Sequence, residues 1–145
     1  MWNEIHNKKD LDSFMKKVDN FHDSCIKEMK YLSGAYVKEN LSMFPENNKR
    51  ILKMIIQRQF EDIPVIEMEF SGLKFIKMFP IEENYTCEIL DATFILKNGL
   101  FYWCDEGGLT EKDFDNYQRT LICAERVCWR TADEYIGEED VYIYR

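Results

Sequence analysis

One segment, DATFILKNGLFYWCD at positions 91–105, constrains the fold more than any other part of the chain. Its centre is Asn98-Gly99, a pair that tolerates positive φ at both positions, as a type I′ turn requires. A two-residue turn there pairs Lys97 with Leu100 and sets the antiparallel register on either side. Opposed residues share a face, so one face is apolar and should lie in the core, while the other is mixed and should be at least partly wet. The apolar set is Ala92, Phe94, Leu96, Phe101 and Trp103, and the mixed set is Thr93, Ile95, Lys97, Tyr102 and Cys104.

Apolar and polar residues also alternate with a period of two elsewhere in the chain. The clearest case is PVIEMEF, where Ile66, Met68 and Phe70 fall on one side and the glutamates between them point outward, as in a half-buried strand. Ser71-Gly72 then predicts a turn or a bulge. Further predicted strands lie at 25–37, 50–60 and 73–79, with a short edge strand at 141–144.

The segment LICAERVCWR at 121–130 fits two patterns. As a strand it places Leu121, Cys123, Val127 and Trp129 on one face. As a helix it gives a stripe through Leu121, Ala124 and Cys128. We favour the strand because β-branched and aromatic residues are common in the segment.

Residues 10–19 predict the single clear helix. Asp10 is a suitable N-cap, and an apolar face follows at i, i+3, i+4 and i+7, formed by Leu11, Phe14, Met15 and Val18. The fold predicted is therefore α+β and mainly antiparallel β, with roughly six to eight strands, each joined to the next by a short turn. The N-terminal helix packs on a curved sheet, and the pattern leaves a partial barrel and a two-layer sandwich both open.

Composition places the chain among globular proteins. With 46% hydrophobic and 14% aromatic residues, it has enough apolar surface to form a core, and we interpret residues 1–145 as one domain. Five cysteines, an odd number without framework spacing, predict free thiols in a reducing compartment. The opening stretch is polar and amphipathic rather than leader-like, and no apolar run has the length of a membrane span. We therefore expect a cytoplasmic protein.

The charge of the chain is uneven. Residues 1–60 carry +3 and residues 61–145 carry −11, for a total of −8. An acidic surface repels nucleic-acid phosphates and membrane headgroups and steers basic proteins inward. We therefore predict a basic protein partner, with charge centres at 105–115 and 133–140, and neither nucleic acid nor membrane. The alternative, that acidic loops only keep the protein soluble, stays open.

The predicted binding residues combine these acids with nearby aromatic and junction residues. They are His22, Asp23, Tyr102, Asp105, Glu106, Asp113, Asp115, Glu138, Glu139 and Asp140. Tyrosines beside acids supply amphipathic contacts; they are Tyr102, Tyr117, Tyr142 and Tyr144.

The junction NFHDS at 20–24 has a functional and a structural interpretation. Adjacent His22 and Asp23 could serve in acid–base chemistry near neutral pH, although successive strand residues point to opposite faces. The structural interpretation, which we favour, has Asp23 or Ser24 accepting backbone N–H bonds, His22 bound to a neighbouring carbonyl and Phe21 anchoring the turn.

Catalytic and metal motifs give little support to an enzyme. Cys104 is the best candidate nucleophile, but the acids after it would raise its pKa, and free cysteines are most often apolar fillers. No CxxC pair is present to suggest zinc, and GxSxG, P-loop, GxGxxG and HExxH motifs are missing. We predict a non-catalytic binding protein with no cofactor and no metal.

Two alternative functions remain open from the sequence. In the first, a small-molecule-binding or enzymatic β-fold brings His22, Asp23 and Cys104 to one pocket. In the second, the chain is a structural homo-oligomer that pairs through the edge strand 141–144.

The chain resembles small uncharacterised bacterial proteins in which an amphipathic opening helix precedes an F-H-D-(S/A) motif and the first strand of a mostly antiparallel fold. The matching residues are Phe21, His22, Asp23 and Ser24, together with a Trp-containing late strand, ERVCWR. Some of these proteins are similar to single-domain immunity proteins of bacterial toxin systems. The resemblance implies protein binding of the immunity type, no catalytic activity and no cofactor.

Overall fold

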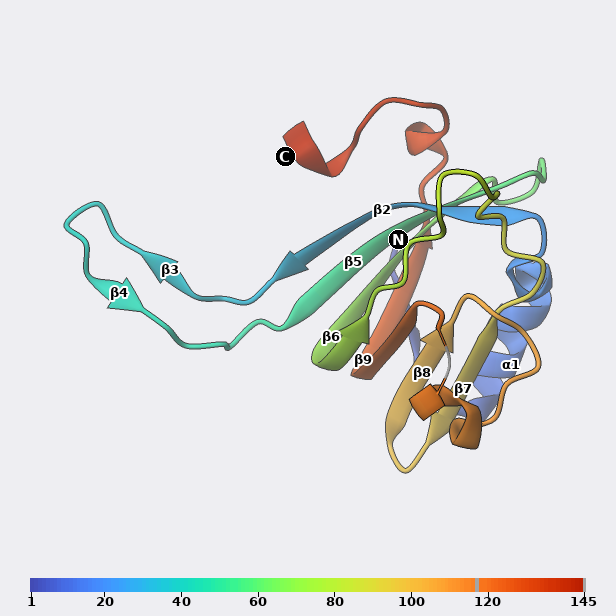
Figure 1. The fold of residues 1–145 in the computed structure, drawn as a ribbon, viewed down its shortest axis with the longest axis horizontal. Helices are drawn as coiled ribbons and strands as arrows, with labels where there is room; N and C mark the ends of the chain where they lie inside the picture. The colour runs from blue at the N-terminus through green and yellow to red at the C-terminus, as the bar shows by residue number, and fades with distance from the viewer. Residues whose placement is uncertain (117, 145) are drawn as a thin grey trace.

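The sheet of this protein is antiparallel and open, and one helix packs against it (Figure 1). The structure, a computed structural model, describes residues 1–116 and 118–144, apart from the side chains of Asn116 and Tyr144. The strands follow the order β2-β5-β6-β9-β8-β7, and β1 also pairs with β9. Their bounds are β1 (Asn3–Ile5), β2 (Ser24–Leu32), β5 (Ile51–Arg58), β6 (Val65–Lys77), β7 (Thr93–Lys97), β8 (Leu100–Cys104) and β9 (Leu121–Thr131). The predicted α+β, mainly antiparallel class is confirmed, and the sheet is not closed into a barrel.

The predicted hairpin at 91–105 is present with the predicted register. Thr93 lies opposite Cys104 and Lys97 opposite Leu100, and Asn98 and Gly99 both have positive φ. The turn chemistry therefore fixes this part of the sheet locally, and β8 then pairs with the first half of β9.

β6 and β9 are the long central strands, and their alternation breaks at one place. The runs predicted at 64–70 and 73–79 form one strand, in which Gly72 has φ +60 and makes no turn. The register with β9 continues past Gly72 and shifts between Leu73 and Phe75, so the bulge lies just after the predicted position. A Cβ at Gly72 would lie 2.9 Å from that of Glu125. Around this point two core residues fall three apart in each strand, Phe70 and Leu73 in β6 and Ala124 and Val127 in β9.

The predicted strand at 121–130 is correct, and Val127 and Trp129 share one face in the core as predicted, but Leu121 and Cys123 do not lie on that face. Ile122 and Ala124 point into the core, not Leu121 and Cys123, because the break at Gly72 changes the face on which β9 residues lie. Leu121 instead joins a separate cluster on the outer face of the sheet. A prediction from strict period-two alternation cannot detect a change of the buried face within a strand.

Helix α1 (Lys8–Lys17) begins earlier than predicted. Its N-cap is Asn7, whose side chain accepts the N–H of Asp10, so Asp10 lies in the first turn and is not the cap. Leu11, Phe14, Met15 and the C-cap Val18 are buried, as the helical pattern predicts. The helix ends at a tight junction in which consecutive residues Asp19, Asn20 and Phe21 have positive φ.

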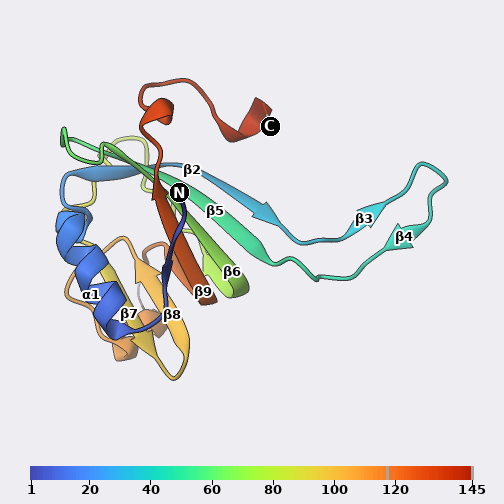
Figure 2. The ribbon, with the colours of Figure 1, turned by 180° about the vertical axis from the view of Figure 1, so that it is seen from behind.

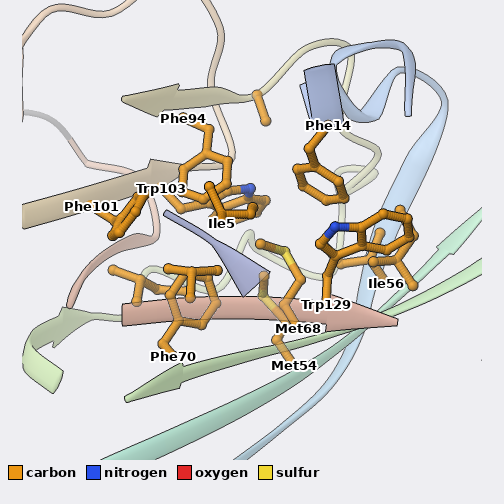
Figure 3. Close-up of a cluster of buried hydrophobic side chains, with 14 of the residues drawn as sticks. Ile5, Phe14, Met54, Ile56, Met68, Phe70, Phe94, Phe101, Trp103 and Trp129 are labelled. Carbon is orange, nitrogen blue, oxygen red and sulfur yellow. The ribbon is translucent and has the colours of Figure 1, made fainter. Parts of the chain in front are cut away.

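The main core lies between α1 and one face of the sheet (Figure 3). The five residues on which the strand predictions depend are all buried there: Ile66, Met68, Phe70, Phe94 and Trp103. Phe14 of α1 packs against Trp129 at 4.8 Å between ring centroids and edge-on against Phe94 at 6.2 Å. Edge-on aromatic pairs of this kind add to the stability that burial provides.

Residues 33–50 form a projecting arm that no sequence pattern had indicated (Figures 1 and 2). The arm links β2 to β5, and its outer part is a two-stranded hairpin of β3 (Tyr36–Val37) and β4 (Met43–Phe44). β2 therefore ends at Leu32 and does not extend to position 37 as predicted.

The outer face of the sheet is covered at two places by chain segments. One is the acidic loop, residues 105–116, which ends in the 3₁₀ helix η2 (Glu111–Asn116). The other is the C-terminal strap, residues 132–144, which contains η3 (Asp133–Tyr135) and η4 (Tyr142–Tyr144). Both figures show the loop and the strap at opposite ends of the molecule.

These coverings correct three predictions. The segment 141–144 is not an edge strand, since Tyr142–Tyr144 form a 3₁₀ helix. Cys104 is buried rather than wet, because Phe114 and Leu121 pack with it. Glu67 points outward as predicted but is only 5% exposed, because Tyr142 and Arg130 cover it. Within the described residues, the helices are all too short or too polar to cross a membrane.

Candidate binding surface

The C-terminal strap is fixed to the sheet by apolar contacts. Ala132 and Val141 are buried against Ile55 and Val65, and Tyr135 and Tyr142 pack beside them. Ile55 of β5 and Val65 of β6 lie on the face of the sheet opposite the main core. The strap buries them there, which explains why both residues are apolar. The strap is thus part of the folded body.

Polar contacts fix the backbone of the strap between these apolar anchors. The Gln57 side-chain amide donates to the carbonyls of Tyr135 and Gly137, at 2.8 and 2.9 Å. Lys27 Nζ donates to the Glu139 carbonyl at 2.7 Å. The turn at 136–140 is therefore held in place by side chains of β2 and β5.

Glu28 holds the far end of the strap. Its carboxylate accepts the backbone N–H groups of Val141 and Tyr142 at 2.9 Å each and the ammonium of Lys27 at 2.9 Å. Burial opposes the ionisation of Glu28, but these donors outweigh it and lower its pKa. A β-bulge between Ile26 and Glu28 accompanies this arrangement on β2.

A second carboxylate ties the strap to the central strands. Glu67 accepts Arg130 Nε at 2.8 Å and the Tyr142 hydroxyl at 2.6 Å. Burial and the Glu67 carboxylate raise the pKa of Tyr142 far above its ordinary range, so this phenol stays a donor. Glu134 of the strap also accepts from Arg130, at 3.0 Å.

The turn of the strap exposes three consecutive acids, Glu138, Glu139 and Asp140. Among the described residues, none of these three carboxylates has an ion pair within 4.0 Å. Two apolar side chains on the same segment, Ile136 and Ile143, are exposed beside them. The strap therefore presents unneutralised negative charge next to apolar surface.

The acidic loop differs because most of its carboxylates are engaged inside the molecule. Asp105 is nearly buried and accepts from Arg119 and the Thr120 N–H. Burial raises the pKa of Asp105, although Arg119 and Thr120 oppose the shift. Glu106 also faces Arg119, at 3.4 Å, and Glu111 pairs with Lys97.

The remaining predicted residues of this loop have local roles. Asp113 accepts the N–H and hydroxyl of Thr110, which closes the turn before η2. Tyr102 stacks on Phe114 at 5.4 Å. Asp115 is exposed beside them. The structure therefore places the two predicted charge centres far apart, and the 105–115 centre is largely neutralised.

Two of the tyrosines predicted for the contact surface also pack within the molecule. Tyr142 is partly buried and its hydroxyl donates to Glu67, and Tyr102 packs in the outer cluster. Tyr117 and the side chain of Tyr144 lie outside the described residues. Ile136 and Ile143 are exposed apolar residues of the strap that the sequence analysis did not name.

His22 and Asp23 lie at the junction between α1 and β2. His22 Nδ1 lies 2.6 Å from the Leu90 carbonyl, and Nε2 lies 3.4 Å from the Asp23 carboxylate. The Leu90 carbonyl and the nearby aspartates raise the pKa of His22, with partial desolvation acting against them. Phe21 is fully buried, and the Ser24 hydroxyl donates to its carbonyl at 2.5 Å. The predicted contact of His22 with a carbonyl is confirmed.

A cavity of about 570 Å³ lies beside this junction, lined by Asp23, Cys25, Arg58 and Cys87 among others. Arg58 is buried, and its guanidinium donates to the carbonyls of Val18, Asp62 and Ile63. It therefore supports the junction backbone. Cys104 belongs instead to the cluster with Phe114 and Leu121, so the structure does not bring it to the cavity that Asp23 lines.

The five cysteines are free thiols. Burial raises the pKa of the Cys104 thiol and, more strongly, that of Cys128, to about 11. In the described part of the chain, His, Cys, Asp and Glu side chains do not gather in groups of three that could hold a metal ion.

Comparison with protein-family models, with curated proteins and with solved structures found no match to this chain.

Proposed function

We propose that this chain is a non-catalytic cytoplasmic binding protein that holds a basic protein partner on its C-terminal strap. The observation that carries the proposal is the run Glu138, Glu139 and Asp140, which is exposed, forms no ion pair with the described residues and lies on a backbone that the sheet holds in place. A fixed backbone lowers the entropy lost on binding. Exposed Ile136 and Ile143 supply apolar contact beside the charges.

The mechanism follows from the arrangement of charge. A net charge of −8 attracts a basic partner over a distance, and the strap then makes the short-range contacts. The F-H-D-S resemblance extends the proposal to an immunity-type role, in which the partner is a basic bacterial toxin. The acidic loop contributes to the long-range attraction but has fewer free carboxylates.

The test compares two variants with the same change in charge. The strap variant carries Glu138→Lys, Glu139→Lys and Asp140→Lys. The control carries Glu61→Lys, Glu82→Lys and Glu83→Lys, at exposed acids outside the strap. Each tagged protein is used for pull-down from the source cell at low and high salt, and retained proteins are identified by mass spectrometry.

We expect wild type and control to retain a basic protein that the strap variant loses, with retention falling as salt rises. Equal loss of the partner in both variants would mean that binding depends on the net charge of the protein and not on the strap. If wild type retains nothing that salt weakens, the proposal is wrong.

A further inference from the structure

The apolar side chains of the arm are not covered by the rest of the described chain. In both figures residues 33–50 extend away from the sheet, with β3 and β4 near the tip. Val37 and Met43 are paired across the hairpin and exposed, and Tyr36 stacks on Phe44 on the other face at 5.1 Å. Two strands of two residues each are marginal in water on their own. The arm therefore exposes surface that a monomer does not use.

The base of the arm is firmly fixed, so its direction is set. The Lys49 and Arg50 N–H groups donate to the Ser33 carbonyl, at 2.9 and 3.2 Å. Gly34 has φ +101, and a Cβ there would collide with Asn48. Tyr31 donates to the Asn47 side chain at 3.2 Å. These contacts clamp the two sides of the arm where they leave β2 and β5.

The tip is also ordered, and it contains a strained residue. The Leu41 N–H donates to the Lys38 carbonyl at 2.8 Å, and the Lys38 N–H donates to the Ser42 carbonyl at 2.9 Å. Leu41 has φ +70 and is 82% exposed. Leucine is unfavourable in this conformation, and glycine or asparagine would be the ordinary choice. Strain of this kind clusters at functional sites, and here it presents a large apolar side chain to solvent.

A groove of about 400 Å³ lies at the other end of the arm. Its walls are Tyr31, Asn47 and Arg50 at the base of the arm, and Leu73, Lys74, Phe75 and Ile76 of β6. Tyr31 and Phe75 are about half exposed, while Leu73 is part of the main core. The groove is thus an opening at the edge of that core in which apolar walls lie beside the cations Arg50 and Lys74.

We propose that the arm pairs two copies of this chain. The apolar tip and the apolar groove lie at opposite ends of one arm, separated by nine residues on each side, on the order of 30 Å. A two-fold axis across the middle of the arm places the tip of each copy at the base of the other. Leu41 and Met43 of each arm then enter the groove of its partner, and both contacts form at once. Such an isologous arrangement is the common form of a homodimer.

The charge distribution favours a second copy at this place. The arm has three basic and two acidic residues, a net charge of +1, which leaves −9 on the rest of the chain. Two acidic bodies repel each other, so two copies approach most easily through the arms. Antiparallel arms also keep the bodies at opposite ends of the pair.

The size of the contact predicts a modest affinity. Five exposed apolar residues of each copy take part: Tyr31, Tyr36, Val37, Leu41 and Met43. At about 100 Å² for each residue, two copies bury roughly 1,000 Å², near the lower limit of specific interfaces. We expect a dissociation constant in the micromolar range, on the order of 1–100 µM.

The first test measures mass in solution by sedimentation equilibrium from about 1 to about 500 µM. Wild type should move from the monomer mass of 17.5 kDa to twice that value. Leu41→Gly should weaken association at least about tenfold while the fold is kept, because glycine accepts φ +70. Leu90→Ser, at another exposed leucine, should associate like wild type.

The second test asks whether the tip of one copy contacts the groove of the other. Leu41→Lys should abolish the dimer, because Arg50 and Lys74 of the groove repel the new charge, and Phe75→Glu should abolish it by removing the apolar wall. The double variant should restore the dimer, because the two new charges are opposite and meet across the interface. A wild type that is monomeric at every concentration would overturn the proposal, as would a dimer that Leu41→Gly leaves intact. If the double variant stays monomeric, tip and groove do not meet, and the proposal fails. A dimer through the arm would leave the strap free, so this result is independent of the pull-down.

Discussion

The arm and the C-terminal strap are both peripheral to the sheet, yet their apolar residues have opposite surroundings. The strap buries Val141 against Ile55 and Val65, and it is tied down by Glu28 and Glu67. The arm leaves Leu41 and Met43 exposed, and its contacts with the rest of the described chain lie at its base. The apolar residues of the strap are thus buried against the same chain, whereas those of the arm are exposed and available to another molecule.

The carboxylates around the strap fall into two groups, one buried and one exposed. Carboxylates that hold the strap are buried and matched with donors, while those on its turn are exposed and unmatched. Buried charges need such partners because desolvation penalises them. The same residue type therefore anchors the segment on one side and presents a surface on the other.

The largest effect is expected where the anchoring of the strap depends on a buried charge. Glu67→Ala leaves Arg130 and the Tyr142 hydroxyl without their buried acceptor, and we expect a loss of about 3 kcal/mol in the free energy of unfolding. Glu134→Ala removes the exposed carboxylate that contacts the same Arg130, and it should cost less than about 1 kcal/mol. Urea denaturation measures both. Equal losses would mean that Glu67 does not anchor the strap.

A smaller and pH-dependent effect is expected at Glu28. Its pKa is lowered in the folded state, so its contribution is complete above the ordinary value of 4.5 and is lost as the pH falls through the lowered pKa. Glu28→Gln should cost about 1–2 kcal/mol at pH 7, and the difference from wild type should vanish in acid.

Hydrogen exchange of the Val141 and Tyr142 amides, followed against pH, measures this effect at the strap itself. Glu69→Gln is the control, since its carboxylate lies 3.9 Å from Lys53 and does not touch the strap. A difference between wild type and Glu28→Gln that stays constant as the pH is lowered below the ordinary value of 4.5 would contradict the assignment.

The smallest effect, and one of opposite sign, is expected at the tip of the arm. Leu41→Gly relieves a positive φ and should stabilise the hairpin by up to about 1 kcal/mol in the monomer. Met43→Gly, in β4, should instead destabilise it by about 0.5–1 kcal/mol. Exchange of the Lys38 amide, which donates to Ser42, measures both at low protein concentration. Loss of protection in both variants would show that Leu41 is not strained.

The sequence predicts the core faces well where the signal is local. The Asn98-Gly99 turn sets the β7–β8 register, and alternation correctly places Ile66, Met68 and Phe70 inside. The pattern fails in β9, because the effect of Gly72 on the neighbouring strand depends on pairing between residues far apart in sequence.

The candidate site is less predictable than the fold. The acidic run Glu138, Glu139 and Asp140 can be found from composition alone. Composition does not show that Asp105 and Glu106 are neutralised, because their partner Arg119 reaches them only through the fold. The arm gives no periodic signal because its outer residues contact one another and not a face of the sheet. The conformation of Leu41 is also set by the turn around it and not by its own preference.

The pairing of β1 with β9 has a consequence for how the protein is made. Asn3 lies opposite Trp129, and Phe14 of α1 packs on the same tryptophan. During synthesis on the ribosome, β1 therefore cannot pair until nearly the whole chain has been made, and α1 cannot complete its packing before then. Contacts between such distant positions slow folding, so β1 should pair last, and the nascent chain exposes part of its apolar surface until β9 has emerged.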